Sequence, residues 1–156
     1  RRVLFRSGLS PPQVPATAPG GYQSVLVVDD SVVQRQHAVR LCRELGIELV
    51  YEAGNGREAL TLLSMLVLPP SLVIVDLEMP GMDGFEFLEE LHRRQTGVPV
   101  LIASSREQVL MDSAATLGSE LGLPMVASLA KPLSLQQLHE TLSTRLPQQE
   151  IGRAHV

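Results

Sequence analysis

Short apolar runs alternate with amphipathic segments along this chain, and that alternation restricts the fold more than any other feature. Three runs are continuous and rich in β-branched residues: VLVV at 25–28, LVIV at 72–75 and VLIA at 100–103. Such runs are typical of strands that are covered on both faces. IELVYEA from Ile47 and MVASLA from Met125 are weaker strand candidates. We therefore expect five strands.

Each strand candidate is followed by a segment in which apolar residues recur three and four positions apart, as on one face of a helix. The five sets are Ala38, Leu41, Cys42 and Leu45; Ala59, Leu62, Leu63 and Leu66; Phe87, Leu88 and Leu91; Leu110, Ala114, Leu117 and Leu121; and Leu135, Leu138, Leu142 and Leu146. Five alternations of strand and helix predict an α/β sandwich around a parallel central sheet.

The two ends of the chain differ from this alternating region. Residues 8–22 contain four prolines and a glycine pair, and they lack a periodic apolar face. We expect them to form an extended linker or a disordered segment. Residues 1–7 (RRVLFRS) and 150–156 (EIGRAHV) resemble translated sequencing-adapter DNA, and we interpret both as non-native segments. Residues 23–147 remain as one domain, and we expect the natural protein to continue past residue 149.

The composition excludes several classes of function. The chain is 44% hydrophobic and 19% charged, with a net charge of -4 and no basic patch, so direct nucleic-acid binding is not expected. An aromatic content of 3% offers no platform on which bases could stack. Proline or charge interrupts every apolar stretch before it could span a bilayer, so no membrane association is expected. The single cysteine, Cys42, excludes an internal disulfide and fits a cytoplasmic location.

Polar residues stand where the strand candidates end. Asp29 and Asp30 follow the first strand, Asp76 the third, Ser104 the fourth and Lys131 the fifth. The carboxyl ends of parallel strands meet at one edge of the sheet. We therefore expect three carboxylates, a hydroxyl and an ammonium group to converge there.

Carboxylates held so close together repel one another, and a hard divalent cation relieves the repulsion. Oxygen ligands suit Mg²⁺ better than zinc. With the metal bound, Asp76 can act as a nucleophile toward a phosphoryl group, whose oxygens Mg²⁺ and Lys131 would neutralise. Gly81 and Gly84 predict a tight loop that keeps Asp76 accessible.

Each of these residues taken alone has a purely structural interpretation. Asp29 and Asp30 could form a strand-end turn or cap a helix, and Asp76 could cap the following turn. Ser104 and Lys131 could be ordinary strand-end residues. Their joint occurrence at four of five strand ends favours the functional interpretation.

Four motifs, VLVVDDS, LVIVDLEMPGMDG, PVLIASS and LAKPL, occur in this order. Together they resemble the receiver domain of bacterial two-component response regulators, over Ser24 to about Leu146. The resemblance implies a flavodoxin-like (βα)5 three-layer sandwich with a five-stranded parallel sheet in the order 2-1-3-4-5. It also implies a phosphoacceptor signalling domain, which supports its own phosphorylation and dephosphorylation and is not an enzyme with turnover on a free substrate.

The resemblance assigns a role to each matching acidic position. Asp76 matches the phosphoacceptor, which receives its phosphoryl group from a sensor histidine kinase or a phosphotransfer protein. Asp30 would bind Mg²⁺ directly and Asp29 mainly through water. The backbone carbonyl of Glu78 matches the third protein ligand of the metal.

Further roles concern the response to phosphorylation. Ser104 matches the hydroxyl that moves toward the phosphoryl group, and Lys131 matches the lysine that pairs with it. The face of the fourth helix, fifth strand and fifth helix would then act on an output domain or an effector protein. Family members often carry an aromatic residue three positions before the lysine, where this chain has Ser128, so the usual aromatic relay is in doubt. The sequence leaves a homodimer open.

Two alternatives remain at this stage. A Mg²⁺-dependent phosphohydrolase with an aspartyl nucleophile generally has a second aspartate two residues after the first, where this chain has Glu78. A pseudo-receiver would dock a partner without being phosphorylated. The segment GLPMVASLAKPLS also resembles receivers fused to cyclic-di-GMP phosphodiesterase (EAL-type) domains.

Overall fold

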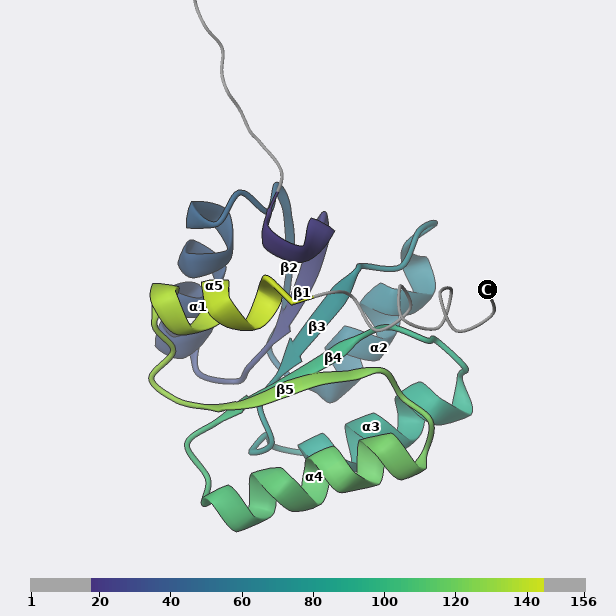
Figure 1. Cartoon of the computed structure of the whole chain (residues 1–156). Helices are drawn as coiled ribbons and strands as arrows, with labels where there is room; N and C mark the ends of the chain where they lie inside the picture. Colours follow the sequence, from purple (N-terminus) through teal and green to yellow (C-terminus); the bar gives the residue numbers. More distant parts are fainter. Residues whose placement is uncertain (1–17, 145–156) are drawn as a thin grey trace, which may run out of the picture.

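The computed structural model describes residues 18–144, in which strands and helices alternate as the sequence predicts (Figure 1). The elements in chain order are η1 Pro19–Gly21, β1 Ser24–Val28, α1 Val32–Glu44, β2 Leu49–Ala53, α2 Gly56–Met65, β3 Leu72–Val75, α3 Gly84–Arg93, β4 Val100–Ser104, α4 Gln108–Glu120, β5 Met125–Ala130 and α5 Leu135–Leu142. The strand boundaries agree with the predicted runs to within two residues.

All five strands join one parallel sheet in the order β2-β1-β3-β4-β5. The predicted flavodoxin-like topology is therefore confirmed. Because β1 lies between β2 and β3, the chain must cross over β1 to begin β3, and the ends of β1 and β3 become neighbours. Val28, the last residue of β1, pairs with Val75, the last residue of β3. Residues that follow these two strands therefore start side by side.

Helices cover both faces of the sheet and complete three layers (Figure 1). One face is packed by α1 and α5, through residues that include Ala38, Cys42, Leu138 and Leu142. The other face is packed by α2, α3 and α4, through residues that include Leu60, Phe87, Leu88, Leu91, Met111 and Ala114. The three central strands, β1, β3 and β4, are buried between the layers, as their continuous apolar runs predict, whereas the edge strands β2 and β5 are mostly half-buried.

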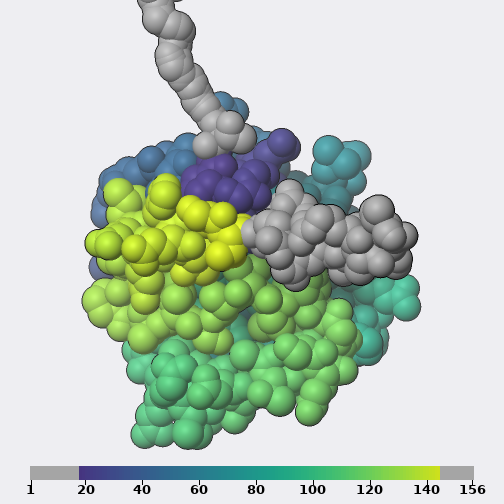
Figure 2. All heavy atoms as spheres, in the orientation of Figure 1, coloured from purple at the N-terminus to yellow at the C-terminus, as the bar shows by residue number. Residues whose placement is uncertain are grey.

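The packed domain begins earlier than the predicted boundary at residue 23. Ala18 and Tyr22 are buried, at 7% and 1% exposure, among the residues of α1 and α5. A Cβ placed on Gly20, at φ +70°, would lie 2.0 Å from the carbonyl oxygen of Leu142, so this turn lies directly against the end of α5 (Figure 2). The prediction of a linker through residue 22 is wrong for Ala18 to Tyr22. Residues 1–17, residues 145–156 and the predicted core position Leu146 lie outside the described residues.

Two helix faces also differ from the periodic prediction. In α4, Met111, Ala114 and Gly118 are the buried residues, so the inward face is turned by one position relative to Leu110 and Leu117. In α5, Leu135 is exposed because it is the first helical residue, and Leu133 from the preceding loop is buried instead. Periodicity identifies a helix more reliably than the rotation at which it docks.

Tyr22 provides a test of the revised boundary. We expect Tyr22→Ala to lower the free energy of unfolding by about 3–5 kcal/mol, because a buried aromatic ring is lost from between α1 and α5. Tyr22→Phe should be as stable as the original chain or more so, since the buried hydroxyl has no hydrogen-bond partner within residues 18–144. Urea denaturation of the three proteins measures both effects, and an unchanged midpoint for Tyr22→Ala would show that this segment does not pack.

Candidate functional site

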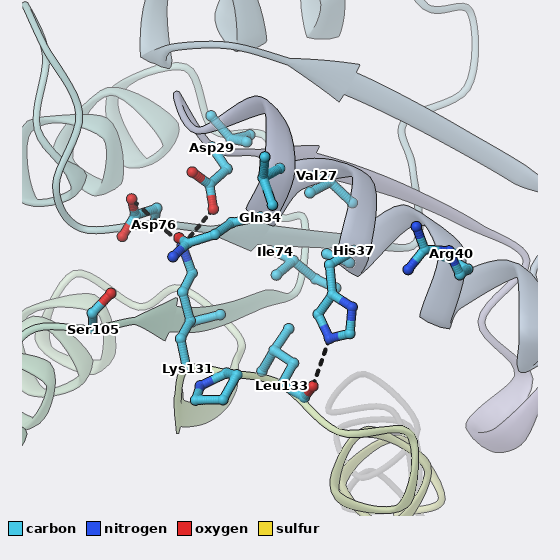
Figure 3. A pocket seen from close by; sticks show the side chains of 15 residues that line it. Val27, Asp29, Gln34, His37, Arg40, Ile74, Asp76, Ser105, Lys131 and Leu133 are labelled. Carbon is cyan, nitrogen blue, oxygen red and sulfur yellow. Dashed lines mark hydrogen bonds and ion pairs between the residues drawn. The ribbon is translucent and has the colours of Figure 1, made fainter.

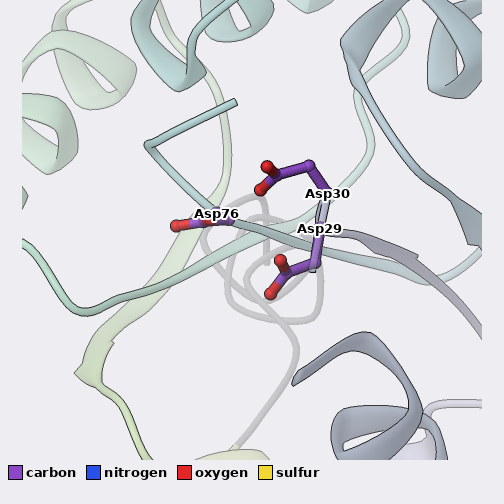
Figure 4. A group of neighbouring side chains, drawn as sticks. All are labelled: Asp29, Asp30 and Asp76. Atoms are coloured by element: carbon purple, nitrogen blue, oxygen red, sulfur yellow. The ribbon is translucent and has the colours of Figure 1, made fainter. Parts of the chain in front are cut away.

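Three carboxylates meet where β1 and β3 end (Figure 4). Asp29, Asp30 and Asp76 each offer an oxygen, and these oxygens all lie within 4.8 Å of one another. Asp29 and Asp76 are buried and Asp30 is exposed. The backbone N–H of Asp76 donates to the carbonyl oxygen of Val28 at 3.0 Å, which extends the sheet pairing into the site. The convergence expected from the strand ends is observed.

The acidic turn after β1 is anchored through one carboxylate oxygen and the backbone carbonyl of Asp29. Asp29 Oδ1 accepts from the N–H of Ser31 at 2.9 Å, and Arg35 Nη1 donates to the carbonyl oxygen of Asp29 at 2.8 Å. The N-cap of α1 is Ser31, whose hydroxyl oxygen accepts from the N–H of Gln34 at 3.2 Å. The alternative in which Asp29 or Asp30 caps the helix is therefore wrong.

The loop after β3 is tight in the way that its glycines predict. Gly81 has φ +83°, a left-handed conformation that favours glycine. A Cβ on Gly84 would lie 2.7 Å from the Cα of Leu77, so only glycine allows α3 to begin this close to the strand end. Asp83 caps α3 in a capping box with Glu86. Asp76 does not cap α3, but its Oδ1 accepts from the backbone N–H of Glu78 at 3.3 Å, so it does cap the following turn while its carboxylate lies beside those of Asp29 and Asp30.

Lys131 reaches the same carboxylates from the end of β5 (Figure 3). Its Nζ forms an ion pair with Asp29 Oδ2, lies 3.6 Å from Asp76 Oδ2 and donates to Gln34 Oε1 at 2.6 Å. The side chain of Lys131 is 9% exposed, so its charge acts in a largely desolvated place.

Ser104 closes the site at the end of β4. It is fully buried, and its hydroxyl oxygen accepts from the backbone N–H of Arg106 at 3.1 Å. Its carbonyl oxygen accepts from the backbone N–H of Lys131 at 3.0 Å, which ties β4 to the residue that carries the cation. The predicted hydroxyl and ammonium groups thus come from adjacent strands.

Burial raises the pKa of the Asp76 carboxyl above its ordinary value of 3.8. The charge of Lys131 and the N–H of Glu78, 3.3 Å from Asp76 Oδ1, act in the opposite direction, while the charge of Asp29 adds to the increase. The net increase in pKa therefore reflects burial more than the balance of charges in the site. A cation bound beside Asp76 would favour the ionised form of its carboxyl.

A hollow of about 570 Å³ adjoins the acids on the side of α1 (Figure 3). Its floor is apolar and reaches the sheet at Val27, Ile74 and Ala103, and its rim includes Asp29, Asp76, Lys131, Gln34 and His37. Asp76 is thus open to a reaction partner although its side chain is mostly buried.

Sequence reasoning missed three residues of the site, all on α1. Arg35 holds the carbonyl of Asp29, Gln34 binds Lys131, and His37 Nε2 lies 2.8 Å from the carbonyl oxygen of Leu133. Gln34 and Lys131 are 97 positions apart, and no spacing pattern predicts their contact. His37 is half-buried, and its contact with the loop after β5 joins segments 96 positions apart.

Two further predicted positions have clear surroundings. The Glu78 side chain is exposed and lies 3.5 Å from Arg106 Nη1, while its backbone carbonyl as a metal ligand stays a prediction. Ser128 lies in β5 opposite Ile102, and its buried hydroxyl has no hydrogen-bond partner in the described part of the chain. No aromatic side chain occupies that position.

Comparison with known proteins agrees with this geometry. A family model described as "Response regulator receiver domain" matches residues 25–143. The chain belongs to this family. It is thus a receiver domain of two-component response regulators, a signalling domain.

Similar proteins include longer regulators. The chain is 32% identical over 114 residues to the "Transcriptional regulatory protein PdtaR" of Mycobacterium tuberculosis, covering 73% of this chain and 52% of that protein. It is 30% identical over 120 residues to the "Cyclic di-GMP phosphodiesterase RocR" of Pseudomonas aeruginosa, covering 77% of this chain and 30% of that protein. This receiver domain thus spans about half the length of PdtaR and less of RocR.

Solved structures agree with the fold assignment. The Vibrio cholerae chemotaxis protein CheY4 superimposes with a TM-score of 0.65 at 28% identity, covering 78% of this chain and 96% of that one.

Within residues 18–144 of this receiver domain, no helix combines the length and apolar character needed to cross a bilayer.

The raised pKa of Asp76 predicts how stability depends on pH. The folded state holds the Asp76 proton more tightly than the unfolded state, so the resulting stabilisation is complete below the ordinary pKa of 3.8 and is lost as pH rises through the raised value. Asp76→Asn removes the ionisation, and we expect its melting temperature without added metal to exceed that of the original chain near neutral pH. The advantage should shrink as the pH is lowered, whereas an advantage that stays constant with pH would contradict this assignment. Asp112→Asn, at an exposed position on α4, is the control.

Proposed function

We propose that this receiver domain accepts a phosphoryl group on Asp76 from a histidine kinase or a phosphotransfer protein. The observation that carries the proposal is the arrangement of Asp76, with two other carboxylates within 4.8 Å and the ammonium of Lys131 at 3.6 Å. Structural roles do not account for this combination, because Ser31 and Asp83 already cap the two neighbouring helices.

The acidic cluster fits a hard divalent cation, and we assign Mg²⁺ to it. Asp30 and Asp76 would bind the metal, Asp29 would act mainly through water, and the backbone carbonyl of Glu78 would complete the protein ligands. The fit rests on three converging carboxylates, whose negative charges the single ammonium group of Lys131 cannot all balance. When bound, Mg²⁺ supplies charge neutralisation for the phosphoryl oxygens.

The residues of the chain have distinct tasks in the transfer. A carboxylate oxygen of Asp76 attacks the phosphorus atom, the phosphorus–nitrogen bond of the donor phosphohistidine breaks, and its electron pair stays on the imidazole. Lys131 stabilises the charge of the transferred group from 9% exposure, where electrostatic interactions are stronger than in water. Ser104 is placed to donate a hydrogen bond to the product, because its hydroxyl oxygen only accepts from the N–H of Arg106 and its own O–H is not used in that contact.

Phosphorylation would act on the output through β4 and β5. It adds about -1.5 to -2 charge near neutral pH. Ser104 and Lys131, which would respond to that charge, begin the connections that lead to α4 and α5. Since Ser128 cannot fill the space of an aromatic ring, the response of the α4-β5-α5 face would depend on these two residues without an aromatic relay.

The nature of the output is a separate proposal. The identity to RocR and the segment GLPMVASLAKPLS support an output that involves cyclic-di-GMP. PdtaR, whose name describes transcriptional regulation, matches equally well, so the receiver domain itself does not select between outputs.

The central experiment uses acetyl phosphate and Mg²⁺. We expect intact-protein mass spectrometry to show one added phosphoryl group, labile in base, on the original chain and none on Asp76→Ala. Asp112→Ala, at an exposed acidic residue of α4, should still be labelled. Repeated release of phosphate from small phosphate esters would support a phosphohydrolase instead, and absence of labelling would support a pseudo-receiver.

Metal binding is tested separately. Asp30→Ala should weaken Mg²⁺ binding roughly tenfold or more, which corresponds to about 1.4 kcal/mol, because a ligand and a charge are removed together. Lys131→Ala should retain metal binding and lose phosphotransfer, since a cation and not a ligand is removed. Titration with Mg²⁺ followed by NMR or calorimetry measures the metal affinity of both variants, and labelling with acetyl phosphate measures the phosphotransfer. Equal Mg²⁺ affinity for Asp30→Ala and the original chain would contradict the assigned ligand set.

A further inference from the structure

Lys131 has a partner on α1 that the acceptor chemistry alone does not require. Its Nζ donates to Gln34 Oε1 at 2.6 Å, in addition to its ion pair with Asp29. An ammonium group has three N–H donors. Asp29 and Gln34 occupy two of them, and Asp76 Oδ2, at 3.6 Å, lies beyond the distance of a good hydrogen bond. One donor of Lys131 is therefore left for a group carried by Asp76.

The backbone of Gln34 is itself held in place by the cap of α1. Gln34 lies in the first turn of α1, where its backbone N–H is bound by the capping hydroxyl of Ser31. Ser31 in turn donates its own N–H to Asp29 Oδ1 at 2.9 Å. The backbone of Gln34 is thus connected, over two hydrogen bonds, to Asp29, which also binds Lys131.

A second contact from α1 fixes the main chain beside Lys131. His37 Nε2 lies 2.8 Å from the carbonyl oxygen of Leu133, and because a carbonyl only accepts, Nε2 carries the proton (Figure 3). His37 follows Gln34 by one helical turn. Helix α1 therefore binds the side chain of Lys131 through Gln34. It binds the backbone of Leu133, two residues later in the chain, through His37.

We propose that Gln34 is a positioning residue, which orients the ammonium group of Lys131 so that its third donor faces a phosphoryl group on Asp76. This inference rests on the proposed function. A lysine side chain is long and flexible, and an acceptor fixed on a helix reduces the number of orientations that its ammonium group samples. A neutral amide does this without adding a fourth negative charge beside Asp29, Asp30 and Asp76.

The kinetic test compares two substitutions of Gln34 with a matched control. Gln34→Leu removes the acceptor, and we expect phosphorylation by acetyl phosphate at saturating Mg²⁺ to slow roughly three- to tenfold, the size of one ordinary hydrogen bond, because the residue positions Lys131 and does not touch the reacting atoms. Gln34→Glu keeps the acceptor oxygen on the same stem but adds a negative charge beside the acids, so we expect it to slow the reaction less than Gln34→Leu does. Gln36→Leu makes the same change on the same helix, where the amide binds Glu52 and not Lys131, and should leave the rate unchanged.

A second readout needs neither phosphate nor metal. Lys131 is the only lysine among the 156 residues, so labelling with ¹⁵N-lysine yields one Nζ signal in the NMR spectrum. We expect Gln34→Leu to shift this signal and to speed the exchange of its protons with water, while Gln36→Leu leaves it in place. If the original chain takes no phosphoryl group, the proposed function fails, and the Nζ signal still decides whether Gln34 holds Lys131.

Several results would overturn the inference. An unchanged Nζ signal in Gln34→Leu would show that the amide does not hold the lysine. A shifted signal with an unchanged phosphorylation rate would show that the contact does not position it for the reaction. Equal slowing by Gln36→Leu would assign the effect to helix α1 as a whole. A parallel loss of Mg²⁺ affinity in Gln34→Leu would assign it to the acidic cluster. If Gln34→Leu does not fold, Gln34→Met, which keeps the stem length and lacks the acceptor, takes its place.

Discussion

Two buried carboxylates at the ends of adjacent parallel strands share one lysine, and the rest of the site is built around that sharing. Asp29 and Asp76 are 4% and 6% exposed, and each alone would be expensive to ionise in such surroundings. Lys131 forms an ion pair with the first and lies 3.6 Å from the second. Its single charge cannot satisfy both, so the site retains a deficit of positive charge that a bound cation removes.

The topology of the sheet makes this arrangement unavoidable. With β1 between β2 and β3, the chain crosses over to the other side of β1, and the acids that follow β1 and β3 emerge next to each other. The same order places β4 and β5 on the far side of β3, so Ser104 and Lys131 approach from one direction only. The helices that follow β1 and β3 begin at separate caps, Ser31 and Asp83, which frees the acids from capping these helices. The site therefore depends on strand order first and on local turn chemistry second.

Much of this could be predicted from the sequence, because the signals are local. Continuous apolar runs identify buried strands, spacing identifies helices, and a polar residue at a strand end identifies the edge where parallel strands finish. The rotation of α4, which buries Met111 in place of Leu110, could not be predicted, since neighbouring elements decide it. The packing of Tyr22 was hidden by a proline-rich composition that is typical of linkers. The contact of Gln34 with Lys131 joins distant segments and leaves no periodic trace.

The distribution of hydrogen bonds around Lys131 bears on how a buried charge can be both fixed and ready to react. A buried ion pair contributes little net stability, because desolvation offsets the attraction, so the pair of Lys131 with Asp29 is weak evidence of a role in folding. Its geometry is better explained by the chemistry at Asp76. Asp29 neutralises the ammonium group and Gln34 orients it. Each accepts one N–H, so the third N–H of Lys131, which faces Asp76, stays free. A lysine bound instead to Asp76 at full hydrogen-bond strength would compete with the metal and with the incoming phosphorus for the same oxygens. Asp29 and Gln34 hold the ammonium nitrogen 3.6 Å from Asp76 Oδ2, which leaves the acceptor oxygen free and the cation already in place.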